Sequence, residues 1–425
     1  MESTSISEKD IYKTSRTLYV IEAALEYFIA VTASGAYLAK LTTSIGISDS
    51  MTAILTSITS LAGIFQLLSI FLAHKTPVKR WVIPTQMLAH LSFAFLYMIP
   101  LLNFGAASTT IFFIAMLLAR ATRSIVSPAK SNWFISLVDD KKRGQFQALL
   151  TIVSLAGYIG FTFILSAIID RFESENNLKG AFLTLTIIIF VLTLLHMLSL
   201  LFSKEKAVVV DKTESPFKSI RKLFENQKYR HVLIMYVLWS LAANIAAPFL
   251  GTYQIKELGF SMTFIAVIDV VLTVLHIPMV YYFGRYSMRH SYSAIMKLSY
   301  IFAFVAHIVL AITTKENGMI VYTLYRVINL ITGAAQGVSS TNLIFDIVPQ
   351  TERTCALSVN TIVVGTVGFL TTLAVSPFVD YVQANGNTVF GINMFAQQAL
   401  AVIAALIILI LIIYYFTLCK KTLEQ

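Results

Sequence analysis

The sequence predicts an all-α membrane protein whose twelve transmembrane helices form two pseudo-symmetric six-helix bundles. Of its 425 residues, 57% are hydrophobic and only 13% are charged, which is about half of the charged fraction typical of soluble domains. A soluble fold with this composition would expose large apolar areas to water, which soluble monomers avoid. The composition therefore excludes soluble enzymes, nucleic-acid-binding domains and secreted disulfide-rich proteins.

A helix that crosses the hydrocarbon core of a bilayer needs about 20 mostly apolar residues. Twelve segments of the chain meet this criterion. They are residues 17–40, 51–73, 81–102, 107–127, 146–169, 181–203, 231–254, 260–283, 294–313, 318–340, 356–379 and 395–418. The first segment is long and has no small-residue cleavage site, so we expect a retained helix and not a signal peptide.

The basic residues predict the orientation of these helices. If both termini are cytoplasmic, 26 of the 32 Lys and Arg residues lie on the inner side. The outer side then holds Lys40, Arg171, Lys179, Lys256 and Lys315. This asymmetry follows the positive-inside rule and indicates a multi-pass protein of the cytoplasmic (inner) membrane. The formal charge of +10 is thereby explained by topology, and we expect no nucleic-acid partner.

A long polar segment divides the predicted helices into two groups of six. We expect an N-terminal bundle over residues 1–203, a cytoplasmic linker over 204–230 that is partly helical along the surface, and a C-terminal bundle over 231–425. Ser131–Arg143, expected in the loop after the fourth helix, aligns with Thr341–Arg353 after the tenth at a shift of 210 residues. The shift of six helices indicates a duplicated half, which is a common way of building transporters.

Three short motifs make the chain similar to a known family. Gly284–His290, between helices 8 and 9, matches a basic loop signature that starts with glycine and here contains Arg285 and Arg289. Asn244–Phe249 matches a pattern of the seventh helix, and Arg120 with Arg123 and Pro128 is similar to an arginine motif of the fourth. On these residues the chain resembles the major facilitator superfamily of secondary transporters over essentially its whole length.

The resemblance implies two halves that rock around a midplane site and expose it to alternate sides of the membrane. It also implies that helices 1, 4, 7 and 10 line a central cavity. Carried over by position, Glu26, Arg120, Asn244 and Arg326 would surround one solvent path. The Gly-Pro-rich motif of drug/proton antiporters is incomplete here, because residues 154–160 lack its proline.

Charged residues within predicted helices are candidates for function, because placing one in a bilayer costs at least ~2.5–3.5 kcal/mol. At 1.5 Å per residue, Glu26 and Arg120 lie about 13 and 10 Å from the cytoplasmic face. Asp269 and Arg326 lie about 13 and 12 Å from the outer face. The depths predict one acid–arginine pair in each half, Glu26 with Arg120 and Asp269 with Arg326. The alternative is that such pairs only allow two helices to pack.

The candidate residues fall into two groups. The predicted substrate- and proton-binding residues are Glu22, Glu26, Arg120, Asn244, Asp269, Arg326, Asn329 and Gln336. The predicted gating residues are Arg143, Gly284, Arg285, Arg289, Asp346 and Arg353. The arginines either brace helix ends or acids such as Asp346, or they serve only as topogenic charge. Four histidines also lie within predicted helices, namely His90, His196, His276 and His307. They could titrate, but we expect them to serve mainly in packing or hydrogen bonding.

The sequence thus predicts a monomeric secondary active transporter in the lipid bilayer that moves a small solute by alternating access. Intramembrane Glu and Asp favour the proton as coupling ion, and the arginines favour an anionic or zwitterionic substrate. The alternative function is a proton-driven exporter of amphipathic drugs or lipids. We expect no enzyme activity, because no His-Glu-x-x-His or Gly-x-Ser-x-Gly motif occurs. We expect no cofactor and no metal site, since Cys355 and Cys419 have no partners at metal-ligand spacing.

Overall fold

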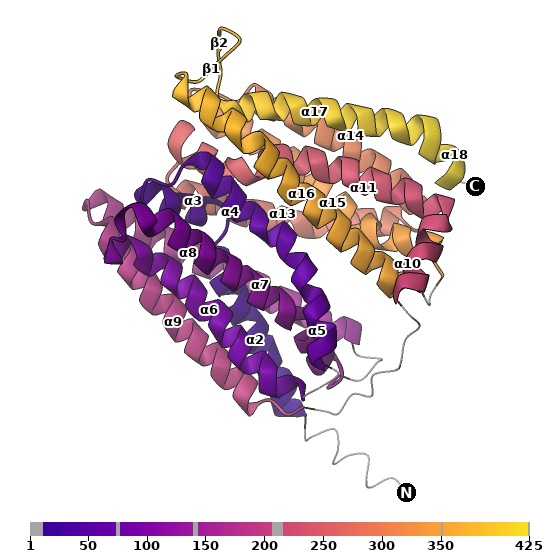
Figure 1. Ribbon diagram of the computed structural model, residues 1–425, viewed down its shortest axis with the longest axis horizontal. Helices are drawn as coiled ribbons and strands as arrows, with labels where there is room; N and C mark the ends of the chain where they lie inside the picture. Colours follow the sequence, from indigo (N-terminus) through magenta and orange to yellow (C-terminus); the bar gives the residue numbers. More distant parts are fainter. Residues whose placement is uncertain (1–11, 74–76, 139–142, 206–215, 350–351, 424–425) are drawn as a thin grey trace, which may run out of the picture. The chain divides into compact units, whose positions relative to one another are not determined.

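The computed structural model describes residues 12–73, 77–138, 143–205, 216–349 and 352–423. These residues divide into two compact units (Figure 1). The first unit holds the described residues of Met1–Ile47 and Ala62–Asp211. The second unit holds those of Ser48–Leu61 and Lys212–Gln425. Residues 48–61 therefore pack in the second unit although the rest of the N-terminal half of the chain packs in the first.

The first unit is built from long helices and two short 3-10 turns. They are α2 (Lys13–Thr32), α3 (Gly35–Ser44), η1 (Ala62–Phe65), α5 (Gln66–Ala73), α6 (Val78–Leu102), η2 (Gly105–Ala107), α7 (Ser108–Ile135), α8 (Arg143–Ser174) and α9 (Leu178–Phe202). Helix α6 packs against α7 and α9, and α2 packs against α8 and α9. These contacts bring α2, α6, α7 and α9 around one interior.

The second unit is also helical, with one small hairpin. Its elements are α4 (Asp49–Leu61), α10 (Pro216–Glu225), α11 (Gln227–Ala246), η4 (Ala247–Phe249), α12 (Leu250–Thr252), η5 (Tyr253–Glu257), α13 (Met262–Tyr286), α14 (Tyr292–Ala311), α15 (Gly318–Ile347), α16 (Arg353–Ala384), β1 (Thr388–Val389), β2 (Ile392–Asn393), α17 (Ala396–Tyr414), η7 (Tyr415–Cys419) and α18 (Lys420–Leu423). Helix α14 packs against α15 and α17, and α11 packs against α16 and α17. Strands β1 and β2 pair antiparallel, and the sequence analysis did not predict them.

The helices agree with the predicted membrane spans. Within the described residues, ten helices are long and apolar enough to cross a membrane, and the bent pair of α2 and α3 makes an eleventh span. The shorter apolar helix Asp49–Phe65 is continued by α5 and covers the second predicted segment. Each of the twelve predicted segments thus corresponds to a helix or a broken helix, as the predicted fold class requires.

Two predicted spans are interrupted. Residues 17–40 were expected to form one helix, but α2 and α3 meet at an angle of 43°. Ser34 between them is extended and Gly35 has φ +52°, a left-handed conformation that glycine adopts without strain. In the seventh span α11 ends before Pro248, whose ring removes a backbone donor. Each break leaves carbonyl groups without an intrahelical donor.

The two duplicated segments are largely helical, which corrects their prediction as loops. Helix α7 continues to Ile135 and α15 continues to Ile347. No Gly or Pro occurs in residues 131–135 or 341–347, so nothing in either segment stops the helix. Lys130, which directly precedes the first of these segments, lies on α7 and is buried.

The predicted linker contains a short amphipathic helix. Helix α10 buries Leu223 in the core of the second unit, against Tyr229 and other apolar residues. Its basic residue Lys222 lies 3.9 Å from Glu352 at the start of α16. This agrees with a linker that is partly helical.

Helices α4 and α16 approach each other closely at Gly365. A Cβ atom added to Gly365 would lie 2.3 Å from the backbone oxygen of Ser60 on α4, a separation that real Cβ atoms essentially never show. The obstacle is backbone, so a side chain at residue 365 would push the two helices apart. Small residues at such contacts are typical of membrane helices, because they let backbones pack closely.

We expect the substitution Gly365→Ala to lower the stability of the protein by roughly 1–3 kcal/mol, because overpacking forces backbone shifts. Thermal unfolding of the purified protein in detergent would measure the change. Gly160→Ala is the matched control, since a Cβ there meets nothing within 4 Å. A melting temperature for Gly365→Ala equal to that of Gly160→Ala would contradict the described contact.

Candidate functional site

The interior of the first unit holds a cluster of charged side chains from α2 and α7. Lys130 Nζ donates to Glu22 Oε1 at 2.6 Å and also to the carboxylate of Glu26. Arg123 Nε donates to Glu26 Oε1 at 2.9 Å. Glu22 is completely buried and Lys130 is nearly so. We call Glu22, Glu26, Arg123 and Lys130 the charge cluster.

The geometry of two helices explains how the charge cluster forms. Glu22 and Glu26 are four residues apart on α2, so both carboxylates project from one face. Arg123 and Lys130 are seven residues apart on α7, which is two turns, so they also share a face. Two negative and two positive groups balance each other. Removing one partner of such a buried pair strands a charge and costs roughly 3–5 kcal/mol.

Polar side chains of α6 and α9 extend the charge cluster. His196 Nε2 lies 2.7 Å from Glu22 Oε1. Gln86 Nε2 lies 2.8 Å from His90 Nε2 and reaches Glu26 Oε1 at 3.5 Å. The rings of His90 and His196 meet edge to face, with centroids 4.5 Å apart. The structure groups these two histidines beside the buried carboxylate of Glu22 and the partly buried carboxylate of Glu26.

The position of Arg120 overturns the prediction that it pairs with Glu26. Arg120 Nη2 donates to the carbonyl oxygen of Ala33 at 2.5 Å, and its guanidinium lies 5.1 Å from the ring centre of Phe93. Ala33 is at the break between α2 and α3, where the helix end exposes carbonyl oxygens with partial negative charge. The depth calculation assumed an unbroken first helix and therefore missed this acceptor.

In the second unit the predicted pair is present. Arg326 Nη2 on α15 donates to Asp269 Oδ1 on α13 at 2.6 Å, and both side chains are about one quarter exposed. Asn329 lies three residues after Arg326, and Gln336 lies seven residues after Asn329. The three side chains therefore share one face of α15. Gln336 Nε2 is buried without a hydrogen-bond partner among the described residues. A polar face therefore runs along α15 from Arg326 to Gln336.

Asn244 lies in the contact between α11 and α16. Its Nδ2 atom donates to the backbone oxygen of Ser240 at 2.9 Å, and its backbone oxygen accepts from Thr372 Oγ1 at 3.0 Å. A Cβ on Gly368 would come within 2.6 Å of Asn244 Nδ2. These contacts lie within the second unit and leave Asn244 partly exposed, and its position on a solvent path stays a prediction.

The predicted gating residues have varied surroundings. Arg353 Nη2 donates to the backbone oxygen of Phe345 at 2.9 Å, near the end of α15, so it braces a helix end. Arg285 lies 5.9 Å from the ring centre of Tyr281, and Gly284 has open space where a Cβ would lie. Arg289 and Asp346 are exposed. The side chain of Arg143 is outside the described residues.

The donor atoms of Glu22, Glu26 and His196 lie within 4.8 Å of one another, a spacing that a metal ion could use. The Lys130 ammonium group, however, is already bonded to both carboxylates and supplies positive charge there. The arrangement therefore favours an internal ion pair over a metal centre.

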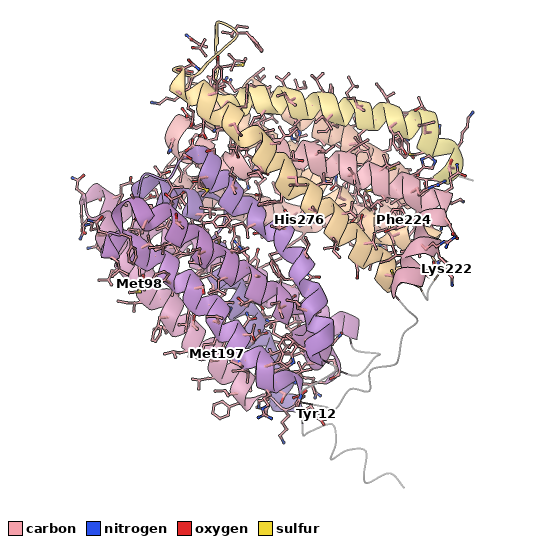
Figure 2. All side chains as sticks on the ribbon, viewed as in Figure 1. Tyr12, Met98, Met197, Lys222, Phe224 and His276 are labelled. Carbon is pink, nitrogen blue, oxygen red and sulfur yellow. The ribbon has the colours of Figure 1, made fainter. Side chains whose placement is uncertain are left out.

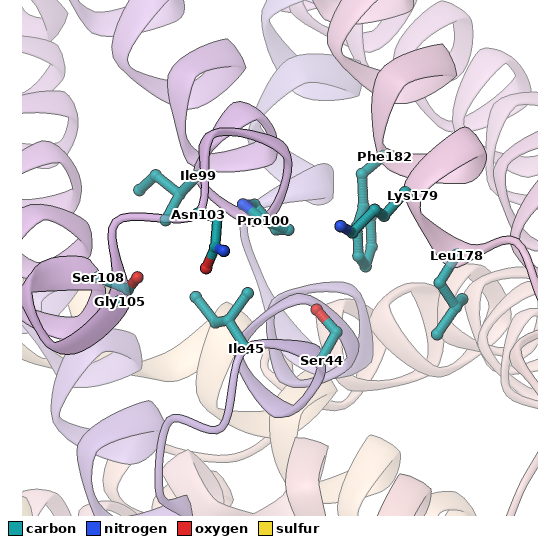
Figure 3. A pocket seen from close by; sticks show the side chains of 10 residues that line it. All are labelled: Ser44, Ile45, Ile99, Pro100, Asn103, Gly105, Ser108, Leu178, Lys179 and Phe182. Carbon is teal, nitrogen blue, oxygen red and sulfur yellow. The ribbon is translucent and has the colours of Figure 1, made fainter.

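A separate cavity of about 460 Å³ lies where α3 and α6 end and α7 and α9 begin (Figure 3). The side chains of Lys179 and Asn103 point into the same space, with the ring of Phe182 beside Lys179 (Figure 3). The residues that line the cavity do not include any member of the charge cluster. Among the other histidines, His276 on α13 is exposed (Figure 2), and His307 Nδ1 lies 2.8 Å from the backbone oxygen of Ala303.

The chain matches a known protein family over most of its length. A family model described as Major Facilitator Superfamily matches residues 23–372. The chain belongs to the Major Facilitator Superfamily. As a member of the Major Facilitator Superfamily, it is a multi-pass membrane transporter.

Solved structures of other Major Facilitator Superfamily transporters share the fold. The nucleoside transporter NupG superposes with a TM-score of 0.74 at 12% identity, over 95% of this chain and 99% of NupG. A bacterial homologue of the human lysosomal transporter Spinster gives 0.71 at 13% identity, over 98% of each chain. A D-xylose–proton symporter gives 0.64 at 15% identity, over 93% of this chain and 97% of the symporter. No curated protein sequence matches the chain significantly.

We expect Lys130→Met to destabilise the protein at neutral pH by roughly 3–5 kcal/mol, because the buried carboxylate of Glu22 would lose its cation and Arg123 alone would balance two carboxylates. Thermal unfolding would show a lowered melting temperature. Lys421→Met is the control, since Lys421 is exposed on α18. If both variants melted at the wild-type temperature, Lys130 would have no part in balancing the charge cluster.

Proposed function

We propose that this Major Facilitator Superfamily transporter couples the movement of protons to the movement of a small anionic or zwitterionic solute across the cytoplasmic membrane. The observation that supports this most is the charge cluster, in which the buried carboxylate of Glu22 and the partly buried carboxylate of Glu26 are each held by cations of α7. Such a cluster can exchange its partners for a proton and a substrate without ever burying an unpaired charge.

The proposed coupling begins at Glu26. As a carboxylate, Glu26 holds both Lys130 and Arg123. A proton on Glu26 removes its negative charge and weakens both ion pairs. The two cations are then available to a carboxylate or phosphate group of the substrate, which replaces the lost negative charge. Proton binding and substrate binding thereby favour each other, which is the definition of a coupling free energy.

Arg326 supports an anionic or zwitterionic substrate from the second unit. Its guanidinium group is paired with Asp269 but is about one quarter exposed. Arginine stays charged at all physiological pH values and presents a planar fork that matches carboxylate and phosphate groups. Organic acids, sugar phosphates and peptide-like molecules are the substrate classes that fit these groups.

Two similarly folded proteins add support for the proton. One is a D-xylose–proton symporter and another is a fucose–proton symporter. Their identities to this chain are 15% and 16%, so their sugars are not transferred to it. In the proposed cycle the protein works as a monomer with both termini in the cytoplasm, and its two halves expose the substrate to alternate sides of the membrane. The distribution of basic residues supports this orientation.

We expect Glu26→Gln to abolish proton-driven transport while the protein still inserts and folds, because the amide keeps the shape of the side chain but does not titrate. The assay is the uptake of a panel of labelled organic acids, sugar phosphates and peptides into proteoliposomes under an imposed pH gradient. The same assay on the wild-type protein identifies the substrate class and the direction of transport.

Glu175→Gln is the control for this assay, because Glu175 is exposed on the loop after α8 and pairs only with the nearby Arg171 among the described contacts. Normal pH-driven flux through Glu26→Gln would remove Glu26 from the coupling mechanism. If the protein transports amphipathic drugs and none of the organic acids, sugar phosphates or peptides, the proposed substrate class is wrong.

A further inference from the structure

His196 is the one buried residue of α9 that hydrogen-bonds a carboxylate of the charge cluster among the described residues. Its Nε2 atom lies 2.7 Å from Glu22 Oε1, which is the same oxygen that accepts from Lys130 at 2.6 Å. Its other ring nitrogen, Nδ1, is buried and has no hydrogen-bond partner among the described residues. His196 therefore holds Glu22 with one nitrogen and has the second nitrogen free.

The charges of the cluster define the protonation state of His196 in this arrangement. Glu22 and Glu26 carry two negative charges, and Arg123 and Lys130 carry two positive charges, so the sum is zero. A third cation would leave a buried excess of positive charge, which is costly. His196 is therefore neutral, with its hydrogen on Nε2 where it donates to Glu22.

We propose that His196 takes up the coupled proton at Nδ1 when a substrate anion draws a cation away from the charge cluster. This proposal rests on the proposed function above and names His196 as the proton-binding residue of the state in which Glu26 keeps its negative charge. When Lys130 turns to the substrate, Glu22 loses one of its two donors and the cluster loses one positive charge. A proton on His196 restores both the charge balance and a charged donor for Glu22.

The proton balance of this step is simple. One proton enters from water, bonds to the Nδ1 lone pair and makes the ring an imidazolium. The Nε2–H bond to Glu22 Oε1 stays in place throughout. When the substrate leaves and Lys130 returns, the proton leaves Nδ1 for water. One proton is thus bound for each negative charge of the substrate that takes a cation from the cluster.

The other groups around His196 are less suited to this step. From α6, His90 has its Nε2 atom beside Gln86 and makes no hydrogen bond to a carboxylate of the described part of the chain. From α7, Arg123 and Lys130 are already charged, and from α2, Tyr19 lies one turn before Glu22 with an acidity far weaker than that of imidazole. Helix α8 has no charged residue between positions 149 and 169. Glu26 and Glu22 are the acids of the cluster, and only Glu22 touches His196.

A transport experiment tests the proposal. Wild-type protein, His196→Gln and the control His307→Gln are compared in proteoliposomes for accumulation driven by a pH gradient and for counterflow at equal pH. His307 is a buried membrane histidine of the second unit whose ring lies against a backbone carbonyl, not an acid. We expect the ratio of driven accumulation to counterflow to fall about tenfold in His196→Gln, within the usual range of coupling, and to stay at the wild-type value in His307→Gln.

The outcomes separate the two proposals. If wild-type protein shows no pH-driven accumulation, the proposed function fails and this inference fails with it. If wild-type protein accumulates substrate and His196→Gln keeps the same ratio, the proposed function stands and the role of His196 is wrong. A purely structural role for His196 lowers accumulation and counterflow together and leaves the ratio unchanged, which also overturns the inference.

A stability experiment tests the same idea without substrate. In Lys130→Met the cluster has lost a cation permanently, so a proton on His196 would restore the charge balance, and the variant should be more stable in acid than in base. We expect Lys130→Met to melt higher at pH 6 than at pH 8, and this difference to shrink in the double variant Lys130→Met/His196→Gln. If Lys130→Met does not accumulate in cells, Lys130→Gln serves in its place.

An equal pH response in the single and double variants would show that a carboxylate takes the proton, and would overturn the inference. Nitrogen-15 NMR of labelled histidine gives a direct reading. An imidazolium signal that is present in Lys130→Met at pH 6 and missing from the double variant supports the proposal. The same signal in both variants would assign the proton to another histidine and contradict it.

Discussion

The pairing of two α2 carboxylates with two α7 cations is the interaction on which the proposed function of the protein depends. Each of these charges would be unfavourable alone in a bilayer, and together they sum to zero. The pairing fixes the rotation of α2 and α7, since both faces must turn toward each other. It also couples the cluster to bound charges, because a proton or an anion that enters the interior changes the charge balance and the ion pairs must rearrange.

The fold could be predicted from the sequence in most respects, because a chain that crosses a bilayer must form apolar helices of a nearly fixed length. The twelve segments, the partly helical linker and the pair of Asp269 with Arg326 all follow from counting residues along apolar stretches. The close contact at Gly365 also agrees with the expected use of glycine between membrane helices. Each of these features can be predicted from the composition of one segment or from the depth of single residues in it.

The composition of the charge cluster could not be predicted in the same way. Depth arithmetic placed Glu26 and Arg120 at one level, but the ion-pair partners are Arg123 and Lys130, one and three turns further along α7. Two local facts made the difference, namely the break in the first helix and the continuation of α7 beyond residue 127. His90 and His196 are over a hundred residues apart and join the cluster only through the packing of α6 on α9. The pairing of two histidines across helices leaves no spacing pattern in a single sequence.

The break at Ala33 and Ser34 has a mechanical consequence. An unbroken first helix would carry any tilt of its acidic segment to its far end, where α3 is anchored by the hydrogen bonds of Tyr37 to Thr162 and Ser166. Because the chain is extended at Ser34, α2 and α3 are separate segments with their own contacts: α2 packs against α8 and α9, and Tyr37 bonds α3 to α8. Arg120 donates to the carbonyl oxygen of Ala33 at the break and so links this point of the first span to α7. The direction of the segment that carries Glu22 and Glu26 is therefore set by the neighbours of α2 and by the bond from Arg120, and it does not have to continue the line of α3.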